Sequence, residues 1–146
     1  MTDGDAAADH TRLSARSVED LAVLAALLQD AIVSVGDIAF LEDERSFVLA
    51  LSRFRWETDE KSAEHERVHA GLRFDTVRRV TYRGIDLGDR AQFLSLLTIS
   101  YDDGVAVLHF SGGGQIRLEV DALNAALEDF GEPWPVFAVP THDDDD

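Results

Sequence analysis

Hydrophobic residues near the start of the chain follow the spacing of an α-helix. The apolar positions that share one helix face are Leu21, Leu24, Leu28 and Ile32. Ser17 precedes them as a candidate N-cap, and Asp20 follows three residues later, a weaker form of the capping box. The pattern predicts an amphipathic helix over this stretch.

After Gly36 the pattern changes to the alternation of β-strands. Seven segments carry it: DIAFL, SFVLALSRFRWE, GLRFDTV, RRVTYRG, FLSLLTISY, VAVLHF and QIRLEV. The polar turn EDER and the Asp-Gly turn at residues 102–104 predict two hairpins. Gly112 to Gly114 join two alternating segments and precede no helix, which favours a hairpin turn over a phosphate-binding loop.

The last hydrophobic segment, DALNAALEDFG, predicts a second helix. Asp121 is its candidate N-cap, Leu123, Leu127 and Phe130 share one face, and Gly131 ends it before Pro133. The fold class that follows is α+β: about seven mostly antiparallel strands forming a bent sheet or roll, with an N-terminal and a C-terminal helix. This is also the element order of pleckstrin-homology-like rolls, an analogy of order only.

Length and composition indicate one domain. The chain has 146 residues, of which 45% are hydrophobic, enough for one core. We expect a single domain over residues 16–136, with disordered acidic tails at 1–15 and 137–146. Absence of cysteine excludes disulfides and thiolate chemistry. The start of the chain resembles no signal peptide, which predicts a cytoplasmic location.

The charge restricts the partners. With 13 basic and 29 acidic residues the net charge is −16, which disfavours nucleic acid and anionic membranes. Residues 53–83 differ, because eight basic residues there outnumber six acidic ones, for a local charge of +2. A positive band therefore lies between two acidic ends.

The arginines of this band are the candidate binding residues. In SRFRWE, Arg53 and Arg55 share one strand face and Trp56 lies at its edge, while Arg79 and Arg83 fall at outward positions of a later strand. If these strands pair, the arginines cluster into a surface for a protein or a small anionic ligand. The alternative is an ordinary exposed sheet face with balanced charges.

The stretch EHERVHAG contains His65, Glu66 and His69 in the order H-E-x-x-H. On a helix this spacing suits a zinc hydrolase, with the histidines as ligands and the glutamate polarising water. The surrounding residues are polar and offer no apolar helix face, and Arg67 interrupts the motif. We therefore interpret the stretch as an exposed loop or the frayed start of the next strand, and assign no catalytic residue, metal ligand or cofactor.

Several short segments resemble a known family. The order of LQDA, VGD, RFRWE, GLRFDTV, RGID, LSLL and FSGGGQIRLEV is similar to the domain-of-unknown-function family numbered 2948. The resemblance covers about residues 18–135 and implies a small cytoplasmic protein of alphaproteobacteria. It carries no catalytic residue over to this chain.

The sequence thus favours a non-enzymatic binding or adaptor domain that presents Arg53, Arg55, Trp56, Arg79 and Arg83 to a protein or small anionic ligand. Two alternatives from other classes stay open. One is a zinc-dependent hydrolase using the HERVH stretch. The other is a structural protein that self-associates, for example as a homodimer, through an exposed strand edge.

Overall fold

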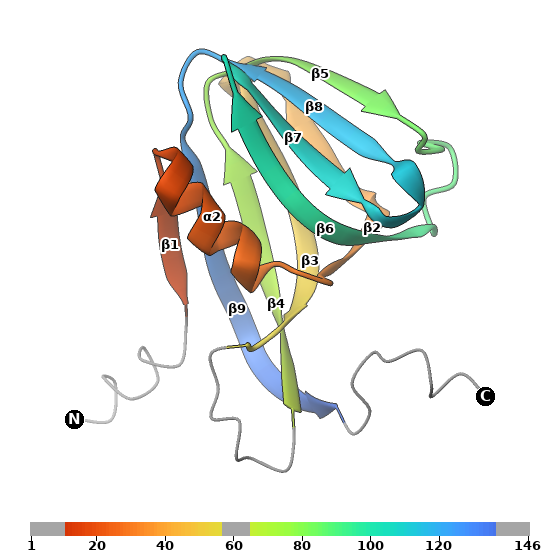
Figure 1. Cartoon of the computed structure of the whole chain (residues 1–146). Coiled ribbons are helices and arrows are strands. Elements are labelled where there is room, and N and C mark those ends of the chain that lie inside the picture. Colours follow the sequence, from red (N-terminus) through yellow and green to blue (C-terminus); the bar gives the residue numbers. More distant parts are fainter. Residues whose placement is uncertain (1–10, 57–64, 137–146) are drawn as a thin grey trace.

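In the computed structural model, which describes residues 11–56 and 65–136, these residues form a bent antiparallel sheet of nine strands and one α-helix (Figure 1). In chain order the elements are β1 (Arg12–Ala15), α2 (Val18–Leu27), β2 (Ile32–Leu41), the 3-10 turn η1 (Glu42–Glu44), β3 (Ser46–Phe54), β4 (His65–Phe74), β5 (Val77–Arg83), β6 (Phe93–Asp102), β7 (Val105–Phe110), the 3-10 turn η2 (Ser111–Gly113), β8 (Gln115–Val120) and β9 (Ala125–Val136). The sheet order is β1-β9-β4-β3-β2-β6-β7-β8-β5, so β1 and β5 are its two edge strands.

The predicted N-terminal helix is confirmed over α2. The hydroxyl of Ser17 accepts a hydrogen bond from the backbone N–H of Asp20 at 3.1 Å, as an N-cap does. Leu21, Leu24 and Leu28 are buried against the sheet. The helix ends at Leu27, however, and Ile32 already belongs to β2.

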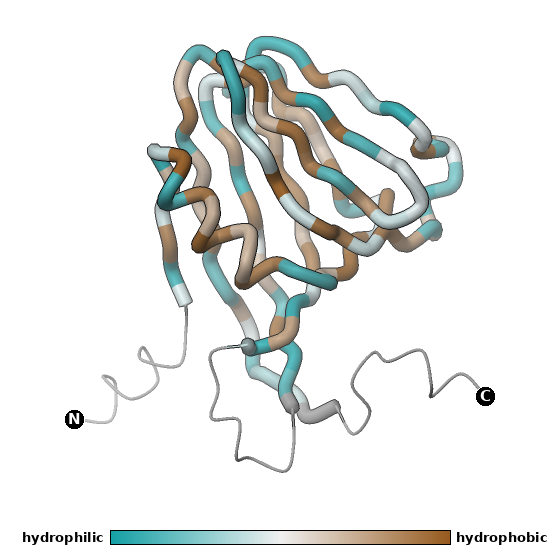
Figure 2. The backbone as a smooth tube through the Cα atoms, in the orientation of Figure 1, coloured by the Kyte–Doolittle hydropathy of each residue, from teal (hydrophilic) through white to brown (hydrophobic). Residues whose placement is uncertain are grey.

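The predicted hairpins are confirmed. β2 and β3 pair across η1, and β6 and β7 pair across a turn in which Asp103 and Gly104 both have positive φ. β7 and β8 pair across η2, where Gly112 and Gly113 also have positive φ. Figure 2 shows hydrophobic and hydrophilic positions alternating along these strands, and the inward positions of β8 are fully buried.

The predicted C-terminal helix is wrong, and so is the predicted α+β fold class of seven strands with two helices. Residues 125–136 form β9, which pairs with β4 over nearly its whole length and with β1 on its other side. Its burial alternates with period two: Ala125, Leu127 and Asp129 are buried, whereas Glu128 and Phe130 are exposed. The hydrogen bonds offered by two flanking strands outweigh the helix propensity of the segment.

β9 and β1 together raise the strand count from the expected seven to nine. β1 lies inside the range assigned to the N-terminal tail, and its four residues pair with residues 125–128 of β9. Of the two predicted tails, residues 1–10 and 137–146 lie outside the described residues, as do residues 57–64.

β2 connects the two halves of the sheet. It pairs with β3 at residues 32–33 and 38–41, with a register shift between Val33 and Ile38. In the described residues it pairs with β6 only through residues 32–34. The sheet folds over at this irregular segment, and α2 lies across the open side between β1 and β6 (Figure 1). Buried side chains from both halves and from α2 form one hydrophobic core. In the described part of the chain, no helix has the length and apolar character needed to cross a membrane.

Candidate functional site

The structure puts Arg53 in the interior. Its side chain is 0% exposed and forms a two-pronged ion pair with Asp129 of β9, with Nε to Oδ1 at 3.0 Å and Nη2 to Oδ2 at 2.8 Å. The register pairs Arg53 with Val68 and Asp129 with Ala70, so the guanidinium crosses the inner side of β4. This arginine holds three strands together and does not reach the surface.

Arg55 and Trp56 are also engaged within the chain. Arg55 is mostly buried and forms an ion pair with Glu66 of β4. The indole N–H of Trp56 donates to the carbonyl oxygen of Gln29 at 3.2 Å, and its ring lies 5.2 Å from that of Phe54. Arg55 thus joins the end of β3 to the start of β4, whereas Trp56 packs on Phe54 at the end of β3 and stays 43% exposed.

The H-E-x-x-H stretch forms the start of β4. This agrees with the second of its two interpretations from the sequence, the start of a strand. Along an extended strand, positions 65 and 69 are about 13 Å apart, whereas helical positions four apart are neighbours. Glu66 faces Arg55, and the His69 ring lies 5.8 Å from the Phe130 ring and 4.7 Å from the Trp134 ring. This backbone does not bring the three residues together as the zinc interpretation requires. The described residues contain no group of three acidic or histidine side chains placed to hold a metal.

Arg79 and Arg83 lie on a different part of the sheet, and the structure adds a third arginine to them. Both are exposed on the outer face of the edge strand β5. β5 pairs with β8, not with β3, and Thr81 lies directly opposite Arg117. Arg79 and Arg83 flank Thr81 along the strand, so the three arginines surround one threonine.

We call this surface the arginine face: Arg79, Thr81 and Arg83 of β5 with Gln115 and Arg117 of β8. Next to it, the ring of His109 on β7 is within hydrogen-bonding distance of the Ser100 hydroxyl, at 3.0 Å. The alternation of QIRLEV predicts an outward Arg117, but nothing in the sequence connects it to Arg79 and Arg83. The missing information was which strand lies beside β5.

The arginine face has an excess of positive charge. Arg79 is 3.9 Å from the carboxylate of Glu119, a weak exposed pair. Arg83 and Arg117 have no carboxylate within ion-pair distance among the residues that the structure describes. The chain as a whole carries −16, so this face is a local reversal of the overall charge.

Fold and site together define a small antiparallel β-sheet domain with a cationic patch beside one edge strand. The chain belongs to the family described as protein of unknown function (DUF2948), whose model matches residues 11–142. No curated protein and no solved structure matches the chain.

Proposed function

We propose that this protein is a non-enzymatic binding domain that docks an acidic segment of a protein partner on the arginine face. The observation that carries the proposal is the pair Arg83 and Arg117, exposed or half-buried on one outer face without a carboxylate partner in the described residues. Arginine is suited to this role because its planar guanidinium can form two parallel hydrogen bonds to a carboxylate.

The position of β5 suggests how the segment binds. Among the described strands, β5 pairs only with β8. On its other edge the backbone N–H of Val77 donates to the carbonyl oxygen of Arg45 at 2.8 Å, so residues 79–83 are the part of this edge that is open to an added strand. Side chains of an added strand alternate between the two faces. On the outer face they meet Arg79 and Arg83, and on the inner face they meet the half-buried Val80 and Tyr82. A segment that alternates acidic and apolar residues fits both faces.

Charge favours such a partner over a second copy of this chain. Two β5 strands paired edge to edge would place arginines beside arginines, and directly opposed like charges destabilise a strand pair. An acidic segment instead forms opposite-charge pairs at the same positions. The same arginines protect the open edge from self-association until the partner binds.

The test is a fluorescence anisotropy titration with a short fluorescein-labelled peptide that alternates glutamate and valine. We expect saturable binding to the native protein and a loss of about tenfold or more in affinity for the R83E/R117E double variant, because attraction becomes repulsion. The R12E/R16E double variant, altered at two exposed arginines at the opposite edge of the sheet, changes the net charge by the same amount and is the matched control. Equal affinity of the peptide for the native protein and the R83E/R117E variant would contradict the proposal.

A further inference from the structure

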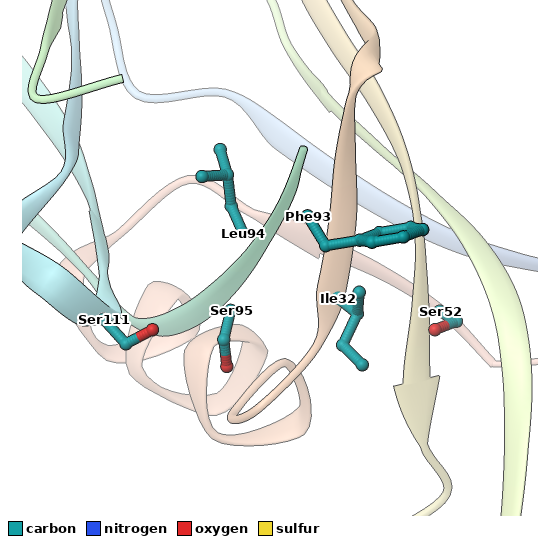
Figure 3. Close-up of a pocket in the computed structure, with 6 residues that line it drawn as sticks. All are labelled: Ile32, Ser52, Phe93, Leu94, Ser95 and Ser111. Atoms are coloured by element: carbon teal, nitrogen blue, oxygen red, sulfur yellow. The ribbon is translucent and has the colours of Figure 1, made fainter. Parts of the chain in front are cut away.

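An open cavity of about 510 Å³ lies on the outer face of the sheet and extends to η2, the turn that leads into β8. Its lining comes from β3, β2, β6 and η2: Ile32, Ser52, Phe93, Leu94, Ser95 and Ser111 (Figure 3). The volume falls within the range of small-molecule sites, which combine apolar walls with a few polar groups. Here the polar groups of the side chains are three serine hydroxyls.

Strand register explains how these residues meet. Ile32 of β2 pairs with Ser52 on one side and with Ser95 on the other, so the three side chains form one row across three strands. Phe93 lies two residues before Ser95 and its ring extends across β2 towards β3 (Figure 3). Phe93 is 71% exposed and Ile32 is 39% exposed. Large apolar side chains are thus left facing solvent beside a hollow.

A buried cation adjoins the Ser52 end of this row. Arg67 of β4 is only 7% exposed. Its Nη2 donates to the carbonyl oxygen of Ser52 at 2.8 Å, and Nη2 and Nε lie 3.0 and 3.3 Å from the Ser52 hydroxyl oxygen. The guanidinium carbon lies 4.3 Å from the centre of the Phe54 ring. One side of Arg67 is therefore held by Ser52 and Phe54.

Arg67 has no carboxylate within ion-pair distance among the described residues. Burial lowers the pKa of its guanidinium from the ordinary value, and the more distant negative charge of Asp30 acts in the opposite direction. An arginine still stays protonated at neutral pH. Burying a charge without a paired countercharge is costly, and a bound anion would lower that cost.

Ser52 connects this cation to the cavity. Its hydroxyl oxygen accepts from Arg67, which leaves the hydroxyl hydrogen free to donate to a ligand. An acceptor bound to that hydroxyl would lie within about 6 Å of the nearest Arg67 nitrogen, given ordinary hydrogen-bond lengths. The cavity thus offers an anion one polarised donor and one nearby positive charge.

We propose that the cavity binds a small organic monocarboxylate with an apolar body. Its carboxylate accepts from Ser52 beside Arg67, and its apolar part covers Ile32 and the Phe93 ring. Two strand spacings separate Ser52 from Ser95, about 10 Å, which a chain of medium length spans. A phosphate dianion fits less well, because one arginine and one hydroxyl donor leave most of its charge uncompensated and most of its oxygens without a donor. Asp30 repels any anion, but it repels a dianion more strongly than a monocarboxylate.

The experiment is a titration of the nitrogen-15-labelled full chain with octanoate, followed by two-dimensional NMR. We expect octanoate to cause saturable shifts at the amides of residues 32, 52, 93 and 95. The affinity for octan-1-ol should be at least about tenfold weaker than that for octanoate, because the alcohol lacks the negative charge that Arg67 attracts. R67M should weaken octanoate to the level of the alcohol. S52A should weaken it several-fold.

Further variants make the result decisive. R12M removes an exposed arginine from β1 and should leave octanoate binding unchanged. F93A changes a side chain that is mostly exposed, so the fold is retained, and it should weaken octanoate and octan-1-ol alike. Equal affinity for the acid and the alcohol, shifts confined to other residues, or no saturable binding would each overturn the proposal. The glutamate–valine peptide should not displace octanoate, so this test and that of the arginine face succeed or fail separately.

Discussion

Arg53 and Arg67 are two buried arginines of neighbouring strands with different surroundings. Arg53 meets the carboxylate of Asp129 with two hydrogen bonds, and both side chains are 0% exposed. Among the described residues, Arg67 meets only neutral hydrogen-bond partners and an aromatic ring. The first arrangement is complete within the chain, while the second is completed by a ligand in our proposal.

The Arg53–Asp129 pair leads to a prediction for stability. R53M leaves the Asp129 carboxylate buried without its cation and should lower the free energy of unfolding by about 3–5 kcal/mol. The double variant R53M/D129L removes both charges and should recover most of that loss. Urea unfolding followed by circular dichroism measures both values. A double variant no more stable than R53M would contradict the assigned role.

At the residue scale, the sequence predicts which side chains of a strand share a face. It does not predict which of the two faces is buried. The pattern of SRFRWE separates Arg53 from Phe54, yet nothing local indicates that the arginine side faces inward. That direction depends on Asp129, which is 76 residues away. In the sequence, Arg67 stands out only as the residue that interrupts the H-E-x-x-H motif. Its role depends on the neighbouring Ser52 and Phe54 of β3, which no local pattern connects to it.

At the scale of elements, β9 provides the clearest test. Ala126 is a half-buried outer-face residue that pairs with Ser14 of β1 and Arg73 of β4. A126T introduces a β-branched side chain, which strands favour and helices disfavour. We expect the free energy of unfolding to rise by roughly 0.5 kcal/mol in urea titrations. A fall of that size is the result that the helix interpretation requires.

Elements with strong local signals were predicted correctly. The capped helix α2, the Asp-Gly hairpin and the alternating β8 each carry their own evidence in a few residues. β9 could not be predicted in this way, since its residues are good helix formers and its strand partners are distant in sequence. Leu123 and Leu127 are buried in either interpretation, so hydrophobic spacing alone could not decide between helix and strand.

At the scale of the whole molecule, charge acts in two opposite directions. A net charge of −16 repels itself within the folded chain, while the arginine face attracts acidic groups. Raising sodium chloride from about 0.05 M to about 0.5 M screens both effects. We expect the midpoint of urea unfolding to rise and the affinity for the glutamate–valine peptide to fall. A peptide affinity that does not change with salt would show that charge is not what the arginine face recognises.

The side chain of Arg53 crosses the inner side of β4, and this restricts which residues can be substituted along its path. Ala70 is 0% exposed and lies opposite Asp129 in the register, so the ion pair passes beside a methyl group. A larger side chain at position 70 would fill the path of the guanidinium and separate the two charges. Positions 53, 70 and 129, which are distant in sequence, are therefore expected to change together during evolution, as one inherited unit.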